Sequence, residues 1–261
     1  MLREETVFGP IHSRRLGNSL GINLLPERGK LCNFDCIYCE CGWNADGHGD
    51  TVLPTASRVR SLLEDKLLRL MMDGVRIDSI TFSGDGEPTL NPEFPRIIDD
   101  TLRLRDTFYP SAKVSVLSNA TRVHVPEILE ALRKVDNPIM KLDAPTDGLA
   151  ALINRPTRGY SVARVVEGLK GFDGGFVLQT MFLRAWTLGP EGEKSECYFD
   201  SAAPEVLLPW MDIVRTLHPR LVQVYTIDRP TPALGLEKYS VEEMRTLVAP
   251  LLEEGFNIQF R

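Results

Sequence analysis

The sequence has no long hydrophobic run. In its 261 residues, no apolar stretch reaches the roughly 20 residues that a membrane-spanning helix requires. The first ten residues, MLREETVFGP, carry charges of both signs and lack the apolar core of a secretory signal. Internal repeats and low-complexity tracts are also missing, which argues against solenoid or linker-rich architectures. We therefore expect a cytoplasmic protein without a membrane partner.

Positive charge is in short supply. The 30 Lys and Arg residues stand against 36 Asp and Glu, which gives a formal net charge of −6. A protein whose main task is to grip nucleic acid usually has a basic surface, because neutralising phosphates supplies much of the affinity. The charge balance therefore argues against a large nucleic-acid interface. The best candidate for a local basic patch is Arg14 and Arg15 together with Arg28 and Lys30.

Cysteine is scarce as well. The chain has five cysteines, and all but Cys197 fall in one short segment, Cys32-Asn-Phe-Asp-Cys36-Ile-Tyr-Cys39-Glu-Cys41. A chain of this size buries a sizeable core without disulfides. Thiols stay reduced in the cytoplasm, so a cysteine cluster there indicates metal ligands or catalytic groups.

Three interpretations of this cysteine spacing are open. Cys32, Cys36 and Cys39 share one face of a helix and would suit a buried helix, but the glycine-rich stretch that follows them favours a loop. Structural zinc needs four ligands, and only a crowded site with Cys41 would supply them. A [4Fe–4S] cluster explains the spacing better, because it takes thiolate ligands. Three thiolates leave one iron with an open position, which is typical of catalytic metal sites.

Short β-rich runs alternate with helical patterns along the chain. This alternation predicts an α/β fold with a parallel sheet and right-handed crossovers. Six such units fit a partial (β/α)6 TIM-like barrel, in which functional residues follow the carboxyl ends of the strands. A surface loop is expected over 186–203. The expected strands are 21–25, 79–82, 113–117, 139–142, 176–182, 221–226 and 257–260. The expected helices are 55–72, 95–104, 126–135, 162–169, 204–217 and 241–252.

The cysteine motif resembles the signature of the radical S-adenosylmethionine (SAM) superfamily. That signature is C-x₃-C-x₂-C with an aromatic residue before the last cysteine, and Tyr38 occupies the aromatic position. The resemblance implies that Cys32, Cys36 and Cys39 hold a [4Fe–4S] cluster, whose open iron binds SAM, and that Tyr38 lies near the adenine. Reductive cleavage of SAM then gives a 5′-deoxyadenosyl radical that abstracts hydrogen from a substrate. The resemblance covers about 13–232.

The whole chain, 1–261, is expected to form a single radical SAM domain, with a C-terminal helix and short strand in 233–261. The resemblance also assigns polar residues at the strand ends to SAM. The predicted strand 79–82 leads into a glycine-rich turn ending in an acidic residue, which suits close backbone approach and an ammonium group. One departure is Asp85, where a second adjacent glycine is common. The expected SAM contacts are Tyr38, Gly84, Asp85, Gly86, Glu87, Ser118, Asn119, Asp143, Gln179 and Arg184.

Simpler structural roles remain open for several of these residues. The glycine-rich turn is also compatible with an ordinary strand-to-helix connection. Asn119 suits the cap of the following helix. Lys141 and Asp143 share a strand face by the period of two, and a surface ion pair is the alternative to a functional one. For Arg184 the expected partner is the carboxylate of SAM, because a guanidinium forms paired hydrogen bonds with a carboxylate.

Three further segments indicate a subgroup. The lead-in 8–17 with 19–26, the segment 82–90, and the pair Arg229 and Pro230 are similar to wyosine-synthase-like iron–sulfur oxidoreductases, which implies a tRNA base as substrate. Archaeal members carry further cysteines for a second cluster, whereas only Cys41 and Cys197 remain here. The alternatives are a glycyl-radical-enzyme activase or a peptide-modifying enzyme and, more distantly, a zinc or iron–sulfur sensor protein. The resemblance also implies a reductant protein such as flavodoxin or ferredoxin, with tRNA, protein or a small molecule as substrate.

Overall fold

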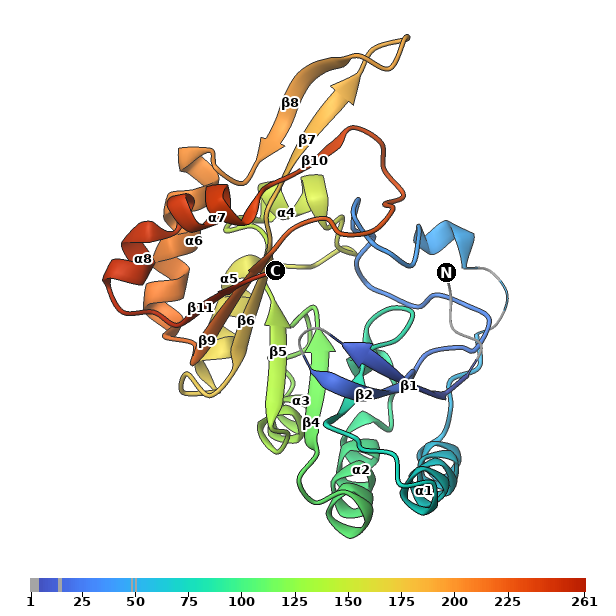
Figure 1. Cartoon of the computed structure of the whole chain (residues 1–261). Coiled ribbons are helices and arrows are strands. Elements are labelled where there is room, and N and C mark those ends of the chain that lie inside the picture. Colours follow the sequence, from blue (N-terminus) through green and yellow to red (C-terminus); the bar gives the residue numbers. More distant parts are fainter. Residues whose placement is uncertain (1–4, 14–15, 48, 50) are drawn as a thin grey trace. The chain divides into compact units, whose positions relative to one another are not determined.

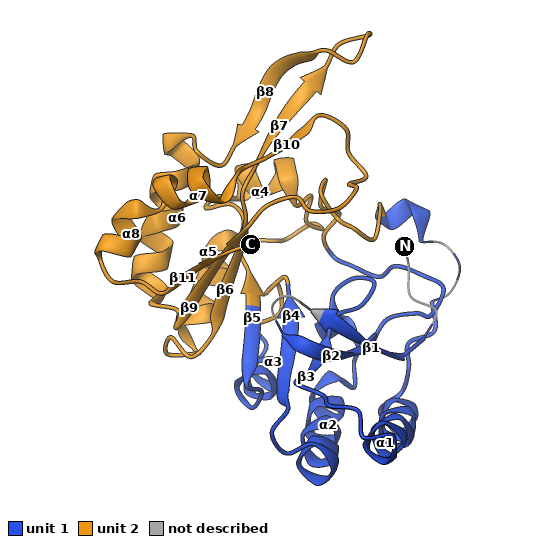
Figure 2. Ribbon diagram, in the orientation of Figure 1, with its two compact units in different colours: residues 1–33, 44–118, 125–139 blue, residues 34–43, 119–124, 140–261 orange. Residues whose placement is uncertain are grey.

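The computed structural model describes residues 5–13, 16–47, 49 and 51–261 (Figure 1). Arg14 and Arg15 of the predicted basic patch lie outside the described residues. The chain divides into two compact units, each made of stretches that are separate in sequence (Figure 2). Unit 1 comprises 1–33, 44–118 and 125–139, and unit 2 comprises 34–43, 119–124 and 140–261. The single domain expected from the sequence stays a prediction.

The described residues of unit 1 form a sheet and three α-helices, with two short 3-10 helices. Its strand order is β1-β2-β3-β4. The first pair is antiparallel, whereas β2, β3 and β4 run parallel. Helix α1 packs against α2, and α2 against α3. The elements are β1 (Val7–Ser13), β2 (Gly17–Ile22), η1 (Asn44–Asp46), α1 (Ala56–Met72), β3 (Ser79–Phe82), η2 (Pro88–Leu90), α2 (Phe94–Phe108), β4 (Lys113–Ser118) and α3 (Pro126–Arg133).

Helix α1 shows how the local sequence sets an element of unit 1. Thr55 is its N-cap, and the Thr55 hydroxyl accepts a hydrogen bond from the Arg58 N–H at 3.3 Å, as capping threonines do. A stripe of buried side chains that includes Leu63 and Leu67 faces the core. The helix ends at Met72, and Gly74, which follows the cap residue Asp73, has a φ of 68°, the left-handed conformation expected of a glycine after a helix. The helix predicted over 55–72 is confirmed.

A row of buried hydroxyl groups crosses the strands of unit 1. The Thr81 hydroxyl on β3 lies 2.7 Å from the Ser19 hydroxyl on β2 and 3.0 Å from the Ser79 hydroxyl. Ser79 in turn lies 3.2 Å from Ser115 on β4, and Asn137 donates to Ser115 at 3.0 Å. Each buried hydroxyl therefore has a hydrogen-bond partner, which removes most of the cost of burying it.

Unit 2 contains the second set of parallel strands. Its strand order is β5-β6-β9-β11, in which β6 is parallel to β9 and β9 to β11. Aromatic packing fills the core, with the rings of Phe182 and Trp210 at 5.4 Å and 76°. The elements are β5 (Asn137–Lys141), which enters this unit at Met140, α4 (Asp147–Ile153), α5 (Val162–Lys170), β6 (Val177–Met181), β7 (Leu183–Leu188), β8 (Lys194–Asp200), α6 (Pro204–Leu217), β9 (Leu221–Tyr225), β10 (Leu236–Lys238), α7 (Val241–Leu247), α8 (Ala249–Glu253) and β11 (Ile258–Phe260).

The prediction of a surface loop over 186–203 is wrong. Strands β7 and β8 form an antiparallel hairpin, and β10 pairs with the other side of β7. Figure 1 shows the hairpin extending beyond the helices of unit 2. Its tip closes with the Gly189 N–H donating to the Glu193 carbonyl at 2.8 Å. The glycines of this stretch lie at the tip, between β7 and β8, and the polar residues at the start of β8 are exposed.

The structure differs from the prediction in the position of one strand and in two elements that were not expected. The strand expected over 21–25 forms earlier, as β2 (Gly17–Ile22), because this stretch pairs with both β1 and β3. Neither β1 nor the short helix α4 was expected. Parallel strands alternate with helices in both units, which confirms the α/β class with a parallel sheet.

Among the described residues, the helices are too short or too polar to cross a membrane.

The first prediction concerns Asp136, between α3 and β5. The Asp136 carboxylate accepts hydrogen bonds from the Val114 N–H (2.9 Å), Arg105 (2.8 Å) and Lys113 (3.0 Å). Partial burial alone would raise the pKa of Asp136, but these three donors together hold it below its ordinary value of about 3.9. The stabilisation is therefore complete at neutral pH and is lost as the pH falls through about 4 and below.

We expect Asp136→Asn to lower the free energy of unfolding by about 1–2 kcal/mol at pH 7 and to flatten its decline between about pH 5 and 3. Urea unfolding across this pH range measures both effects. Asp65→Asn, on the exposed face of α1, is the control and should leave stability nearly unchanged. An acid profile of Asp136→Asn that parallels wild type would contradict the assignment.

Candidate functional site

In unit 1, the turn that follows β3 pairs with the segment before Cys32. Leu31 and Gly86 form a parallel β-bridge. The Leu31 N–H donates to the Asp85 carbonyl at 3.0 Å, and the Glu87 N–H donates to the Leu31 carbonyl at 3.0 Å. Gly86 has a φ of +140°, and a Cβ there would lie 1.8 Å from the Leu31 oxygen. Only glycine therefore allows these segments to pair so closely.

The carboxylate of Glu87 is held at the end of this turn. Glu87 is 2% exposed. Its Oε1 accepts hydrogen bonds from the Thr89 hydroxyl at 2.6 Å, the Thr89 N–H at 3.1 Å and the Ser118 hydroxyl at 2.8 Å. Ser118 is the last residue of β4. Two predicted SAM contacts at the ends of neighbouring strands are thus in direct contact.

Asn23 supports the same turn and was missed by the sequence analysis. It lies directly after β2 and is fully buried. Its Oδ1 accepts from the Leu25 N–H at 3.2 Å and the Asp85 N–H at 3.3 Å. A Cβ on Gly84 would lie 2.0 Å from this oxygen. The one available signal was a polar residue within an apolar run, which by itself does not indicate a partner.

Cys32 is anchored in unit 1, and the rest of the cysteine motif belongs to unit 2. The Cys32 carbonyl accepts from Asn44 Nδ2 in η1 at 3.2 Å. In unit 2, the Cys39 N–H donates to the Cys36 carbonyl at 3.1 Å in a turn. The motif is not helical, so the alternative of three buried cysteines on one helix is wrong.

The segment around Cys36 is fastened to the end of α4. The Asp35 N–H donates to the Asn154 carbonyl at 2.9 Å, and the Ile37 N–H to the Ile153 carbonyl at 3.0 Å. The last carbonyls of a helix have no partner within the helix. Here the cysteine loop supplies two of these partners, and this fixes the backbone on both sides of Cys36.

Tyr38 and Asp143 meet in a buried polar cluster of unit 2. The Tyr38 hydroxyl donates to Asp143 Oδ2. Asn154 Nδ2 lies 2.7 Å from the Tyr38 hydroxyl and 2.8 Å from Asp143 Oδ2, and the Met181 N–H donates to Asp143 Oδ1 at 2.8 Å. Burial, followed by the charge of Asp143, raises the pKa of Tyr38. Tyr38 is therefore protonated at neutral pH and acts as a donor.

Lys141 supplies the positive charge of this cluster. Its Nζ lies 3.7 Å from Asp143 Oδ1, donates to the Tyr225 hydroxyl, and lies 5.1 Å from the Tyr38 ring centroid. Burial alone would lower the pKa of Lys141, but the charge of Asp143 and the contact with Tyr225 raise it overall. The side chains of Lys141 and Asp143 are 18% and 0% exposed, so the alternative of a surface ion pair is wrong.

The thiols of the motif fit an iron–sulfur cluster by their chemistry. Burial raises the pKa of Cys36 to about 11, and the nearby charge of Lys141 opposes this rise. A metal deprotonates a coordinating thiol outright, so the raised pKa does not prevent ligation. Within the described residues, no group of three or more His, Cys, Asp or Glu side chains is arranged to hold a metal ion. The ligand roles of Cys32, Cys36 and Cys39 stay a prediction.

Three other predicted SAM contacts have protein partners of their own. Asn119 Oδ1 accepts from the Thr121 N–H at 3.1 Å and the Thr121 hydroxyl at 2.7 Å in a local turn, and it does not cap the following helix α3, whose N-cap is Val125. Gln179 donates to Gln223 at 3.3 Å in the interior. Arg184 is the third, and its surroundings lie in the three-stranded sheet.

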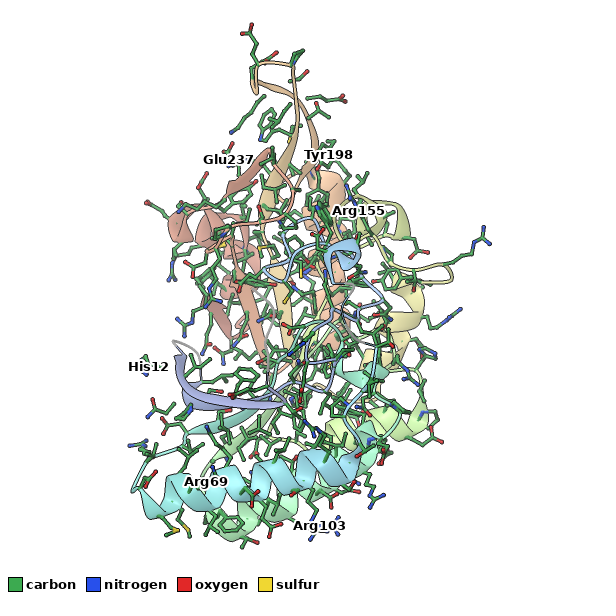
Figure 3. The ribbon with its side chains drawn as sticks, turned by 90° about the vertical axis from the view of Figure 1, so that its right-hand side faces the viewer. His12, Arg69, Arg103, Arg155, Tyr198 and Glu237 are labelled. Atoms are coloured by element: carbon green, nitrogen blue, oxygen red, sulfur yellow. The ribbon has the colours of Figure 1, made fainter. Side chains whose placement is uncertain are left out.

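The Arg184 guanidinium is surrounded by three carboxylates. It lies 3.0 Å from Glu237, 3.3 Å from Glu243 and 3.5 Å from Asp200, and it stacks over the Tyr239 ring at 3.9 Å. Glu237 is labelled in Figure 3. These partners join β7, β8, β10 and α7. The SAM roles of Asn119, Gln179 and Arg184 stay predictions.

The pair Arg229 and Pro230 belongs to a segment that contacts the cysteine motif within unit 2. Arg229 Nη1 lies 2.8 Å from Glu40 Oε2, between Cys39 and Cys41 in sequence. The Ala233 N–H donates to the Ile37 carbonyl at 3.2 Å. The segment after β9 therefore lies along the cysteine loop.

Comparison with known families gives a match over more than half of the chain. The model of the Radical SAM superfamily matches residues 27–183. A protein named GTPase Obg from Brachyspira hyodysenteriae is 29% identical over 247 residues, which cover 93% of this chain and 33% of that protein. A UPF0026 protein from Synechocystis sp. is 28% identical over 233 residues, which cover 87% of this chain and 77% of that protein. The chain thus spans about a third of the first relative.

Solved structures share the fold. A radical SAM methyltransferase from Sphaerobacter thermophilus superposes with a TM-score of 0.67 at 17% identity, covering 93% of this chain and 65% of that one. SuiB from Streptococcus suis, solved bound to S-adenosylmethionine, superposes with a TM-score of 0.59 at 16% identity, covering 94% and 52%. The resemblance to wyosine-synthase-like enzymes stays a prediction, since the relatives are UPF0026 proteins and a GTPase Obg.

The second prediction tests the pairing between Leu31 and Gly86. Gly86→Ala places a side chain on a backbone conformation that favours glycine, which costs about 1–3 kcal/mol. The added Cβ also collides with the Leu31 carbonyl. We expect it to lower the free energy of unfolding by at least this amount in urea. Gly148→Ala is the matched control, because a Cβ at Gly148 meets nothing within 4 Å. Equal stability of Gly86→Ala and wild type would rule out the pairing.

Proposed function

The chain belongs to the radical SAM superfamily, and from this premise we propose that it cleaves SAM reductively to abstract hydrogen from a substrate. Enzymes of this superfamily use a [4Fe–4S] cluster and SAM. When bound, the cluster supplies one electron to the sulfonium of SAM, which breaks a carbon–sulfur bond and yields methionine and a 5′-deoxyadenosyl radical. The protein's own part is to bind and orient these groups.

The observation that carries the proposal is the pairing of Leu31 with Gly86 in unit 1. It sets the residue before Cys32 beside a turn that ends in the carboxylate of Glu87. A carboxylate suits the ammonium group of an amino acid such as SAM, and the backbone of a glycine turn allows close approach. The motif that would hold the cluster and the turn that would hold the SAM amino group are thus neighbours through backbone hydrogen bonds.

We assign the following roles within this proposal. Cys32, Cys36 and Cys39 are the cluster ligands. Gly84, Asp85, Gly86 and Glu87 bind the amino group of SAM, and Ser118 orients the Glu87 carboxylate by donating to it at 2.8 Å. Tyr38 presents its ring to the adenine, while its hydroxyl is fixed by Asp143.

Asn119, Gln179 and Arg184 remain proposed contacts to the rest of SAM. Each would have to exchange or share a protein partner. This demand is greatest for Arg184, because its guanidinium is already paired with three carboxylates.

For the substrate, a tRNA base is the first proposal. It is supported by the similarity of 8–17, 19–26, 82–90 and the pair Arg229 and Pro230 to wyosine-synthase-like enzymes. The contact of Arg229 with Glu40 adds that this pair lies beside the cysteine motif. The net charge of −6 weighs against a large nucleic-acid interface.

A protein or peptide substrate is the second proposal, and the hairpin favours it. Strand β8 is at the edge of the three-stranded sheet, in the order β10-β7-β8, and most of its residues are exposed or half-buried. The edge of a sheet can pair with an extended peptide through backbone hydrogen bonds. As the electron donor we propose a flavodoxin or ferredoxin in the cytoplasm.

The third prediction tests the cluster and the reaction. Reconstituted anaerobically with iron and sulfide, the protein should turn brown, bind about four irons, and release 5′-deoxyadenosine from SAM on reduction. We expect Cys36→Ala to lose the iron and the reaction. Cys197→Ala is the control and should retain both, because Cys197 lies on β8. A colourless zinc protein that is unaffected by Cys36→Ala would contradict the function.

A substrate screen separates the two substrate classes. The protein is incubated with SAM, reductant and either tRNA or peptide substrates carrying deuterium, and 5′-deoxyadenosine is analysed by mass spectrometry. Deuterium in 5′-deoxyadenosine from one class identifies that substrate. Deuterium from neither class leaves SAM cleavage intact and rejects both substrate proposals.

A further inference from the structure

Asn154 has no role in the site so far except as a hydrogen-bond partner. It follows α4 directly, is 2% exposed and lies wholly within unit 2. Its Nδ2 is 3.5 Å from Cys36 Sγ, 2.7 Å from the Tyr38 hydroxyl and 2.8 Å from Asp143 Oδ2. One buried amide thus contacts a thiol of the motif and the two residues that form the polar cluster.

The backbone makes this contact specific to Cys36. The Asn154 carbonyl accepts from the Asp35 N–H, and the Ile153 carbonyl accepts from the Ile37 N–H. These two bonds flank Cys36 in sequence. Asn154 itself is fixed through its own N–H, which donates to the Ala150 carbonyl at 2.8 Å. Backbone hydrogen bonds of the neighbouring residues therefore hold the Cys36 thiol beside the Asn154 amide.

We propose that Asn154 is a positioning residue that donates a hydrogen bond to the cluster-bound sulfur of Cys36 and thereby raises the reduction potential of the cluster. The inference rests on the proposed function, because it requires that Cys36 ligate a cluster. Hydrogen bonds to cluster sulfurs are among the factors that set the potentials of iron–sulfur proteins. A donor stabilises the reduced cluster more than the oxidised one, because the reduced cluster carries one more negative charge.

The Asn154 amide has enough hydrogens to donate to Cys36 as well as to the buried polar side chains beside it. The Asn154 amide has two hydrogens and three neighbouring acceptors. Asp143 already accepts from the Tyr38 hydroxyl and the Met181 N–H. The Tyr38 hydroxyl and Asp143 Oδ2 are hydrogen-bonded to each other, so one amide hydrogen faces this pair and the second is directed to Cys36. A thiolate is a stronger acceptor than a thiol.

A purely structural role for Asn154 would fasten the loop without changing the potential. The two roles differ in what they affect. Side-chain replacements leave the backbone bonds of Asn154 to Asp35 and Ala150 in place. The loop attachment should therefore survive in a variant that loses the donor to Cys36.

The fourth prediction is made for the reconstituted full chain without SAM. We expect Asn154→Ala and Asn154→Asp each to lower the midpoint potential of the cluster, measured by a redox titration followed by electron paramagnetic resonance. The expected change is about tenfold in the one-electron equilibrium, or about 59 mV. Leu152→Ala is the control, because Leu152 lies on the same helix and is 40% exposed. Its potential should equal that of wild type.

The outcomes separate this inference from the proposed function. If wild type cleaves SAM and both variants hold a cluster at the wild-type potential, the role of Asn154 is overturned and the proposed function stands. Loss of the cluster in both variants, with wild type loaded, assigns Asn154 to folding of the loop and also overturns the inference. A wild-type protein that binds no cluster overturns the proposed function and this inference with it.

Discussion

The close approach of Leu31 to Gly86 is the constraint on which the proposed site depends. Leu31 forms backbone hydrogen bonds with Asp85 and Glu87, the residues on either side of Gly86, and a Cβ at Gly86 would lie 1.8 Å from the Leu31 oxygen. Cys32 and Glu87 follow these two residues directly, so their backbone positions are set by the same pairing. The carboxylate is then oriented by Ser118 from the next strand. A glycine conformation thus determines where an acidic group and a cysteine lie within unit 1.

In unit 2 the main constraint is the burial of a charged side chain. Asp143 has no exposed side-chain surface, and an unpaired carboxylate there would be strongly unfavourable. Lys141, Tyr38, Asn154 and the Met181 N–H surround it with donors. Such a cluster is stable only when each member is satisfied, which fixes its members relative to one another. Cys36 contacts this rigid cluster through Asn154, so the cysteine loop is attached to a fixed support.

The parts of the structure that were predictable are those with a local signal. The period of α1 and its terminal glycine predicted that helix, and the turn after β3 was found from its glycines and acidic residues. The hairpin β7–β8 was missed because its exposed faces carry the composition of a loop. Asn23 and Asn154 were missed for a different reason. Each belongs to no motif, and its role arises only when folding brings it beside residues distant in sequence.

Arg184 shows the limit of reasoning from strand ends. The rule that polar residues after parallel strands form the site gave the position of each side chain but not its partners. Ser118 and Glu87 meet as that rule implies, because Ser118 ends β4 and Glu87 lies in the turn after the adjacent strand β3. Arg184 lies on β7, which turns into a separate antiparallel sheet, and its charge is balanced by Asp200, Glu237 and Glu243. The strand-end rule therefore holds where the strands are parallel. After β6 the chain passes from the parallel sheet into the antiparallel sheet, where β7 begins at Leu183.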